Sequence, residues 1–303
     1  MSIYIGIDGG GTTTRILIES AGGPPQYFEC NVSIKARHGN FEPSAIALLF
    51  LLHSKLGDDL SDVHAIAIGL SGMSRTEDQE ALKQAIHGIP ELSQVKLHVE
   101  TDATLTLAAV IPEGEPGILL IAGTGSVIFY QPRGGTPRRI GGWGPTLSDE
   151  GSGYRLGLRV LRRYVHVLDG IVPHDALSEA IANRLPPEAR EDRFALSRLV
   201  EQEPSLVASL ARDVLDAAMD PLSDIDVLRE EFIELILMVL PICSFEIMNS
   251  PRPYNLYLSG SVAKHPMTIE VLKRGFDESD VYFIPVDDHV PCMKALEIAK
   301  GIV

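Results

Sequence analysis

Two glycine-rich segments and three aspartates are the residues of this sequence whose types and spacing could do chemistry. The first segment, 8–14, reads Asp-Gly-Gly-Gly-Thr-Thr-Thr between two runs of apolar and β-branched residues. Glycine permits positive φ and close backbone approach, and consecutive amide N–H groups can form an anion-binding concavity. Asp8, at the end of the preceding strand, is a carboxylate that can hold hydrated Mg²⁺. A plain glycine-rich hairpin explains the same residues equally well.

A second glycine-rich turn between two strands occurs at 123–126, which reads Gly-Thr-Gly-Ser between predicted strands at 117–122 and 127–131. Each of these glycine-rich segments forms the tip of a predicted hairpin, and we call them the first and second glycine tips. Two such tips at the start of two similar parts of the chain could hold one polyphosphate from both sides. A third segment of small residues, 258–263, follows an apolar strand and precedes a helix. Small residues there would let a flat ring approach the backbone, although strand–glycine–helix junctions are common.

Asp102 lies just after the predicted strand 95–99 and begins the predicted helix 102–110. Ligands of α/β proteins bind at the carboxyl ends of strands, so Asp102 is a candidate general base. Either Thr101 or Asp102 would also cap this helix well, which is the structural alternative.

The only tryptophan, Trp143, lies in the segment Gly-Gly-Trp-Gly-Pro at 141–145. A core position and a ring that stacks on a ligand are about equally consistent with this glycine-rich setting. Asp149 and Glu150 follow directly. They could favour the start of the predicted helix 152–168 through its dipole, or they could accept hydrogen bonds from substrate hydroxyls.

The pattern of apolar residues predicts which elements position these groups. Three strands open the chain at 3–7, 15–19 and 26–32, and helix, strand, helix, strand and helix follow. The same opening recurs from residue 117, with a third strand at 137–140, before a series of helices that includes 226–247. The sequence therefore predicts an α/β fold with two domains, 1–115 and 116–303.

Composition narrows the range of partners. The 303 residues carry 26 Lys and Arg against 41 Asp and Glu, which gives a net charge of −15. This charge argues against nucleic acid or an anionic membrane surface as the main partner. The three cysteines, Cys30, Cys243 and Cys292, form no zinc or disulfide pattern, and the N-terminus lacks a signal peptide. We expect a cytoplasmic protein with reduced thiols.

Taken in order, these motifs resemble those of the BadF/BadG/BcrA/BcrD ATPase family, and most closely its N-acetylglucosamine and glucosamine kinases. The resemblance covers essentially the whole chain and is carried by 8–12 (Asp-Gly-Gly-Gly-Thr), 101–103 (Thr-Asp-Ala), 121–126 (Ile-Ala-Gly-Thr-Gly-Ser), 141–144 (Gly-Gly-Trp-Gly), 149–153 (Asp-Glu-Gly-Ser-Gly) and 259–263 (Ser-Gly-Ser-Val-Ala).

The resemblance implies two ribonuclease-H-like domains of the actin-like ATPase type, with ATP and Mg²⁺ bound in the cleft between them. It also implies that the last helix, 291–299, can return to the first domain. Asp102 matches the base that deprotonates the sugar 6-hydroxyl, and Asp8 matches the acid near Mg²⁺. The positions that match ATP contacts are Gly9, Gly10, Gly11, Thr12, Thr13, Gly123, Thr124, Gly125, Ser126, Gly260 and Ser261. The positions that match sugar contacts are Asp102, Thr124, Gly142, Trp143, Gly144 and Asp149.

The implied reaction is the ATP-dependent phosphorylation of N-acetylglucosamine to N-acetylglucosamine 6-phosphate. Glucosamine and N-acetylmuramic acid are the alternative sugars, and the ATPase activator of a CoA-ester reductase or dehydratase system is the alternative function. The family's sugar-contacting asparagine corresponds to Asn31 or Asn40, and Ser148 stands where a glycine is usual. A homodimer is compatible with the sequence.

Overall fold

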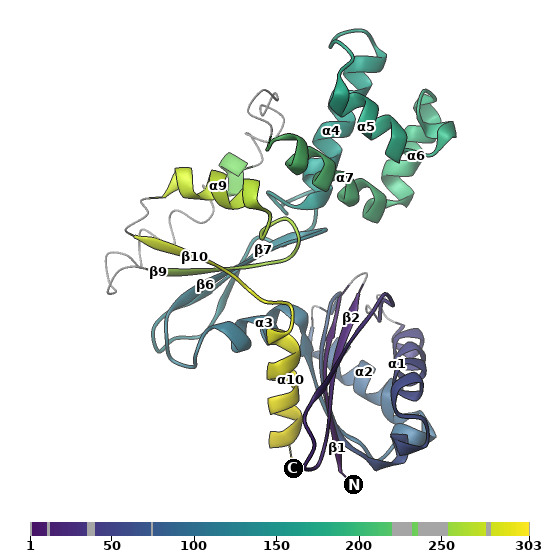
Figure 1. Ribbon diagram of the computed structural model, residues 1–303, viewed down its shortest axis with the longest axis vertical. Helices are drawn as coiled ribbons and strands as arrows, with labels where there is room; N and C mark the ends of the chain where they lie inside the picture. Colours follow the sequence, from purple (N-terminus) through teal and green to yellow (C-terminus); the bar gives the residue numbers. More distant parts are fainter. Residues whose placement is uncertain are drawn as a thin grey trace. The chain divides into compact units, whose positions relative to one another are not determined.

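The computed structural model describes residues 2–10, 13–34, 40–73, 75–219, 232–235, 254–276 and 280–302. These residues form two compact units (Figure 1). Unit 1 comprises Met1–Glu113 and Asp287–Val303, and unit 2 comprises Gly114–Val286. Unit 1 thus includes the last helix, which is the alternative that the resemblance implied. Across the described ranges, no helix has both the length and the apolar character needed to cross a bilayer.

Unit 1 is built on a five-stranded sheet in the order β3-β2-β1-β4-β5. Its strands are β1 (Ile3–Gly9), β2 (Thr14–Ser20), β3 (Gln26–Cys30), β4 (Val63–Leu70) and β5 (Lys96–Thr101). The first three strands are antiparallel neighbours, while β4 and β5 run parallel to β1. Apolar residues line both faces of β1 and β4, which is the pattern of a sheet that is covered on both sides.

Helices cover both faces of this sheet (Figure 1). Helices α1 (Glu42–Leu56) and α2 (Thr76–His87) pack on one face, and α3 (Asp102–Val110) and α10 (Val290–Gly301) pack on the other. Short 3₁₀ helices, η1 (Gly57–Asp62) and η2 (Pro90–Leu92), precede β4 and β5. Helix α10 lies so close to β1 that a Cβ atom at Gly6 would be 2.3 Å from the Leu296 backbone nitrogen.

Unit 2 repeats the architecture of unit 1. Its sheet has the order β10-β9-β6-β7-β8 and consists of β6 (Gly117–Ala122), β7 (Ser126–Gln131), β8 (Arg138–Ile140), β9 (Tyr254–Ser259) and β10 (Val281–Pro285). Strands β6, β7 and β8 are antiparallel, and β9 and β10 run parallel to β6. Each strand therefore has a counterpart in unit 1, which confirms the predicted α/β fold with two similar domains.

The helices of unit 2 are α4 (Gly153–Leu168), α5 (Ala176–Arg184), α6 (Arg193–Gln202), α7 (Pro204–Ala217) and α9 (Pro266–Gly275), with the 3₁₀ helix η3 (Pro187–Ala189). Ser152, the first residue of the predicted helix 152–168, is instead the N-cap of α4, and Asp175 is the N-cap of α5. Both side chains accept hydrogen bonds from backbone N–H groups. The predicted helix 226–247 lies outside the described residues except for 232–235, which are helical.

Candidate active site

Asp8 and Asp102 lie at the same edge of the unit 1 sheet. Asp8 is near the carboxyl end of β1, and Asp102 follows the carboxyl end of β5 as the first residue of α3. The intervening strand β4 has Gly69 beside Asp8. A Cβ atom at Gly69 would lie 2.5 Å from Leu105 Cδ2 and 3.3 Å from Asp102 Cα. The absence of a side chain at Gly69 therefore lets α3 carry Asp102 close to β1.

The structure separates the two roles that the sequence left open for Asp102. The Thr101 hydroxyl accepts a hydrogen bond of 3.0 Å from the Thr104 amide, so Thr101 is the N-cap of α3. The Asp102 carboxylate instead accepts a hydrogen bond of 2.8 Å from the Ala103 amide in the first turn of the helix. A carboxylate at this position is favoured by the helix dipole. Thr101 therefore takes the N-cap position, and Asp102 follows it as the first residue of the helix.

Asp8 is largely buried and has several charged neighbours. Its side chain is 13% exposed and its carboxylate is 3.6 Å from the Arg15 guanidinium. Burial raises the pKa of Asp8 to about 7, and the negative charges of Asp102 and Asp288 add to this effect while Arg15 opposes it. The charges of Asp8 and Asp102 thus act on each other, so the two predicted site residues of unit 1 are brought together.

Arg15 and Asp288 belong to the same cluster and were missed by sequence reasoning. The Arg15 guanidinium also lies 3.3 Å from the Asp288 carboxylate, which precedes α10. Arg15 pairs with Asp8 across the β1–β2 hairpin. The register of that hairpin, with a tip of four residues, is the signal that could have identified Arg15. No local pattern in the sequence identifies Asp288, because its position depends on the packing of α10.

The small number of carboxylates at this sheet edge, Asp8 and Asp102, fits the way that Mg²⁺ is bound in proteins. Among the described residues, no group of three or more His, Cys, Asp or Glu side chains could hold a metal ion. Mg²⁺ keeps several waters and takes only one or two carboxylates together with substrate phosphates. Asp8 beside Asp102 is such a sparse donor set. Burial is the main reason that the pKa of Asp8 is raised, and the negative charge of Asp102, which a bound cation would offset, adds to it.

The first glycine tip, residues 9–13, is only partly described, because Gly11 and Thr12 lie outside the described residues. Neither Gly9 nor Gly10 has a positive φ. Gly9 packs closely against its neighbours: a Cβ atom there would lie 2.6 Å from Leu70 Cδ1, so that side chain would have to move. The Gly10 amide donates to the Thr13 carbonyl at 3.0 Å and closes the turn.

The second glycine tip, residues 123–126, is held by the start of α4. The Gly123 and Thr124 carbonyls accept hydrogen bonds from the Gly153 and Tyr154 amides at 2.7 and 3.1 Å. The buried Ser126 hydroxyl donates to the Glu150 carbonyl at 2.7 Å, so its hydrogen is committed within the protein. In the described part of the chain, the Thr124 and Gly125 amides donate to no other group.

The 259–263 loop lies against this second tip. Gly260 has a φ of +90°, and a Cβ atom there would lie 2.4 Å from the Ala122 carbonyl oxygen. That oxygen accepts hydrogen bonds of 3.0 Å from both the Val262 and the Ala263 amides. Ser261, between Gly260 and Val262 in the chain, is exposed. Unit 2 therefore brings two of the predicted ATP-binding segments into contact.

Asp149 has an unusual backbone and a buried carboxylate. Its φ is +65°, which makes it the single non-glycine residue with positive φ in the described ranges. The carboxylate accepts a hydrogen bond of 3.2 Å from the Gly144 amide, and its other oxygen would lie 2.9 Å from a Cβ atom at Gly125. Burial raises the pKa of Asp149, whereas the Gly144 hydrogen bond lowers it. Strained non-glycine positions of this kind cluster at functional sites.

Trp143 is 79% exposed, so it has no core role in the structure. It lies between Gly142 and Gly144, whose φ angles of +67° and +92° bend the loop around the Asp149 carboxylate. The predicted sugar contacts of unit 2 are therefore neighbours: the tryptophan loop (141–147), Asp149 and the second glycine tip.

The two candidate asparagines lie apart in unit 1. Asn31 is exposed in the segment that follows β3, and the nearby Ser33 hydroxyl donates to the Gly10 carbonyl at 3.3 Å. This contact places the 31–34 segment beside the first glycine tip. The Asn40 side chain instead accepts a hydrogen bond from the Glu42 amide at the start of α1.

The sequence profile of the BadF/BadG/BcrA/BcrD ATPase family matches residues 5–299, which is nearly the whole chain. The chain belongs to the BadF/BadG/BcrA/BcrD ATPase family. An N-acetylmuramic acid/N-acetylglucosamine kinase of Clostridium acetobutylicum is 32% identical over 254 residues, covering 79% of this chain and 78% of that protein. An N-acetyl-D-glucosamine kinase of Dictyostelium discoideum is 28% identical over 63% of this chain and 62% of that protein.

Solved structures agree with this family assignment. A Chromobacterium violaceum protein, provisionally described as an N-acetylglucosamine kinase, superimposes on this chain with a TM-score of 0.75 at 26% identity, covering 98% of both chains. A glucokinase of the ROK family from Streptomyces griseus has a TM-score of 0.54 at 14% identity, covering 99% of both chains. The second likeness shows the fold alone.

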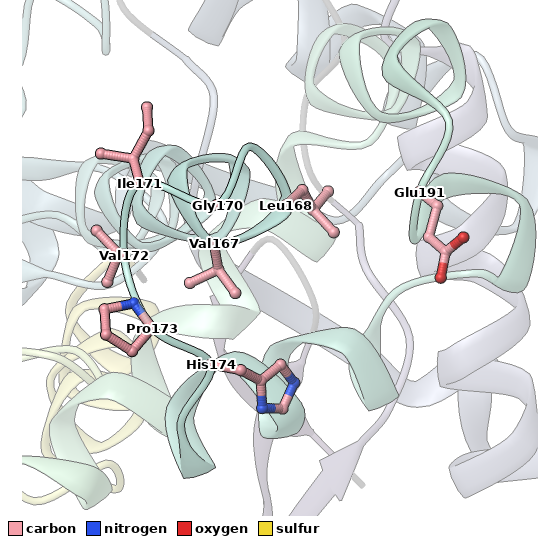
Figure 2. Close-up of a pocket in the computed structure, with 8 residues that line it drawn as sticks. All are labelled: Val167, Leu168, Gly170, Ile171, Val172, Pro173, His174 and Glu191. Atoms are coloured by element: carbon pink, nitrogen blue, oxygen red, sulfur yellow. The ribbon is translucent and has the colours of Figure 1, made fainter.

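A depression of about 710 Å³ lies elsewhere in unit 2 (Figure 2). It is lined by the end of α4 and the segment that follows, with Glu191 on the other side. None of the predicted site residues lines it. The candidate active site is therefore defined by the side chains at the strand ends and not by this depression.

Proposed function

We propose that this protein transfers the γ-phosphoryl group of ATP to the 6-hydroxyl of an amino sugar, with N-acetylglucosamine as the first candidate. The observation that carries the proposal is the position of Asp102, at a strand end beside Asp8, with the capping role taken by Thr101. The amino-sugar kinases among the relatives support the choice of acceptor.

In this reaction Asp102 accepts the proton of the attacking hydroxyl. Phosphoryl transfer depends mainly on positioning and charge stabilisation, and a general base adds about 10²- to 10⁴-fold. The first turn of α3 fixes the direction of the Asp102 carboxylate, because its oxygen accepts the Ala103 amide. Since Asp102 follows directly from the Thr101 cap, its Cα is fixed by the first turn of α3, and the Ala103 hydrogen bond orients the carboxylate.

Asp8, assisted by Asp102, would hold Mg²⁺ through its bound water and thereby orient the phosphates of ATP. Mg²⁺ supplies neutralisation of the negative charge on the transferred phosphoryl group when it is bound. The open amides of Thr124 and Gly125 are the clearest phosphate donors of unit 2. The proposed ATP contacts are Gly9, Gly10, Gly11, Thr12, Thr13, Gly123, Thr124, Gly125, Gly260 and Ser261, while Ser126 shapes the tip through Glu150.

Asp149 and Trp143 would bind the sugar. One Asp149 oxygen is occupied by the Gly144 amide, which orients the carboxylate so that the other oxygen can accept a sugar hydroxyl. The exposed face of Trp143 is available for stacking on the apolar face of the ring. Thr124, Gly142 and Gly144 complete the proposed sugar contacts of unit 2. Because ATP is the phosphoryl donor, we place the reaction in the cytoplasm.

A coupled ADP-release assay tests the proposal. The panel contains N-acetylglucosamine, glucosamine, N-acetylmuramic acid, N-acetylmannosamine and glucose, with the Asp102→Asn variant as the inactive control. We expect the highest kcat/KM with N-acetylglucosamine or its acidic derivative and little stimulation by glucose. Sugar-independent ADP release that persists in Asp102→Asn would contradict the proposal.

A further inference from the structure

Two consecutive arginines, Arg138 and Arg139, begin the short edge strand β8 beside the candidate sugar site. Both are exposed, in a chain whose net charge is −15. In the described part of the chain, neither guanidinium has a carboxylate within ion-pair distance, whereas the neighbouring Arg133 is paired with Glu115. The pair of arginines is therefore a local excess of positive charge in an acidic protein.

Only Arg139 is directed to the candidate site. Strand β8 pairs with β7 so that Arg138 lies opposite Tyr130, which is buried in the core, and Arg139 lies opposite Phe129. Side chains alternate between faces along a strand, so the two arginines leave the sheet on opposite sides. The Arg139 guanidinium donates to the Gly142 carbonyl within the tryptophan loop, and a Cβ atom at Gly142 would lie 2.7 Å from it.

Arg139 is also an electrostatic neighbour of Asp149. Its positive charge lowers the pKa of that carboxyl, against the larger effect of burial. The hydrogen bond to Gly142 uses one N–H group of a guanidinium that has five. A group of this kind beside a hydroxyl-binding carboxylate can bind a second, anionic part of the same ligand, because guanidinium and carboxylate form paired charge-assisted hydrogen bonds.

We propose that Arg139 binds the carboxylate of an acidic substituent on the amino sugar and so determines how efficiently carboxylated amino sugars are used relative to uncharged ones. This inference rests on the proposed function. N-acetylmuramic acid, which is N-acetylglucosamine with a lactyl ether on O3, is the representative of this class. Arg139 is therefore a specificity-determining residue, which is distinct from the reacting groups in unit 1.

The phosphates of ATP are the other anions that Arg139 could bind. The sugar carboxylate is favoured because Arg139 contacts Gly142 and acts on Asp149, which are both proposed sugar contacts. Binding to ATP phosphate and binding to the sugar carboxylate have different kinetic effects. Loss of a phosphate contact raises the KM for ATP with every sugar, whereas loss of a carboxylate contact raises the KM for the acidic sugar. The experiment therefore measures the KM for ATP alongside that for each acceptor.

The test is the ratio of kcat/KM for N-acetylmuramic acid to kcat/KM for N-acetylglucosamine. It is measured in the wild type, Arg139→Gln, Arg139→Lys and the matched control Arg138→Gln, which removes the same charge from the opposite face of β8. We expect Arg139→Gln to lower the ratio about tenfold or more, mainly through the KM for N-acetylmuramic acid. Arg139→Lys should restore part of the ratio, and Arg138→Gln should leave it unchanged.

An uncharged analogue, 3-O-methyl-N-acetylglucosamine, separates charge from size. Its kcat/KM relative to N-acetylglucosamine should be insensitive to Arg139→Gln. The inference is overturned if the wild type uses N-acetylglucosamine but not N-acetylmuramic acid, if Arg138→Gln lowers the ratio as much, if the methyl ether is affected equally, or if only the KM for ATP rises. Those results leave the proposed function intact, whereas a wild type that phosphorylates no sugar contradicts both.

Discussion

At the scale of single residues, small differences in hydrogen bonding separate structural from chemical roles. Thr101 caps α3, and Asp102 follows it as the first residue of the helix. Ser126, which resembles a phosphate ligand in the sequence, has a buried hydroxyl that donates to Glu150. A pattern of residue types cannot distinguish these cases, because the same hydroxyl or carboxylate serves both purposes.

The first prediction concerns Asp102. Asp102→Asn keeps the size of the side chain and an acceptor for the Ala103 amide, but it removes the group that takes the proton. We expect kcat to fall by about 10²-fold or more, with ATP affinity retained. Steady-state kinetics and calorimetric titration of ATP check this. Near-normal kcat in a folded variant would remove Asp102 from the mechanism.

The second prediction concerns the pH dependence of stability. The native pKa of Asp8, about 7, lies above its ordinary value of 3.8, so the folded state binds more protons between these values. Stability without Mg²⁺ should therefore fall as pH rises from about 4 to 7, with a slope of up to about 1.4 kcal/mol per pH unit. Asp8→Asn removes this slope.

Urea unfolding in the presence of a chelator measures the effect. At pH 8 the Asp8→Asn variant should be more stable than the wild type, and the difference should shrink as the pH is lowered towards 4. Parallel stability curves for the two proteins across this range would show that Asp8 is not a source of electrostatic strain.

The third prediction uses a pair of glycines in the second tip. A Cβ atom at Gly125 would lie 2.9 Å from the Asp149 carboxylate, whereas one at Gly123 would have no neighbour within 4 Å. Neither glycine has a positive φ. Gly125→Ala should therefore raise the KM for the sugar at least about tenfold by displacing Asp149, and Gly123→Ala should not. Equal sugar KM values in the two variants would argue that Asp149 does not contact the sugar.

At the scale of elements, the ends of helices and strands follow from local rules, but their packing does not. The predicted helix 102–110 matches α3 at both ends, because an N-cap threonine and a short apolar run define it. The tryptophan loop shows the opposite case. Its glycines indicate an irregular loop, but the positive φ of Asp149 and the contact with Gly125 depend on α4 and β7.

The fourth prediction tests the packing of α10 on β1. A Cβ atom at Gly6 would lie 2.3 Å from the Leu296 nitrogen and 2.5 Å from the Cys292 oxygen, and these are backbone atoms that cannot rotate away. Gly6→Ala should destabilise the protein by about 1–3 kcal/mol or more and lower the urea midpoint. Gly23→Ala is the matched control, since its nearest neighbour would be 3.5 Å away. An unchanged midpoint for Gly6→Ala would contradict this packing.

At the scale of the whole molecule, the two units share one strand order although their sequences show little similarity. A sheet requires alternating or continuous apolar residues and suitable turns, and many different sequences satisfy these requirements. The repeated order of elements was therefore predictable from the sequence. The membership of α10 in unit 1 depends on contacts between distant residues, such as Lys300 with Glu19 at 2.7 Å, and local patterns could not decide it.

The candidate site also combines local sequence features with contacts between residues that are far apart in the sequence. Most of its residues were identified by motif, because glycine tips and strand-end carboxylates are local features. Arg15, Asp288 and Arg139 were missed, since their relation to the site arises from hairpin register, the return of α10 and the pairing of β8. These three charged residues modify the electrostatics around the carboxylates that the motifs identify.

The most direct measurement of the central claim is the position of the phosphate on the product. The protein is incubated with ATP, Mg²⁺ and N-acetylglucosamine, and the product is examined by phosphorus–proton correlation NMR. Transfer to the 6-hydroxyl predicts coupling between the phosphorus and the two protons on C6, with one ADP formed for each phosphorylated sugar. Coupling to the anomeric proton, or stoichiometric inorganic phosphate with unmodified sugar, would contradict the proposed function.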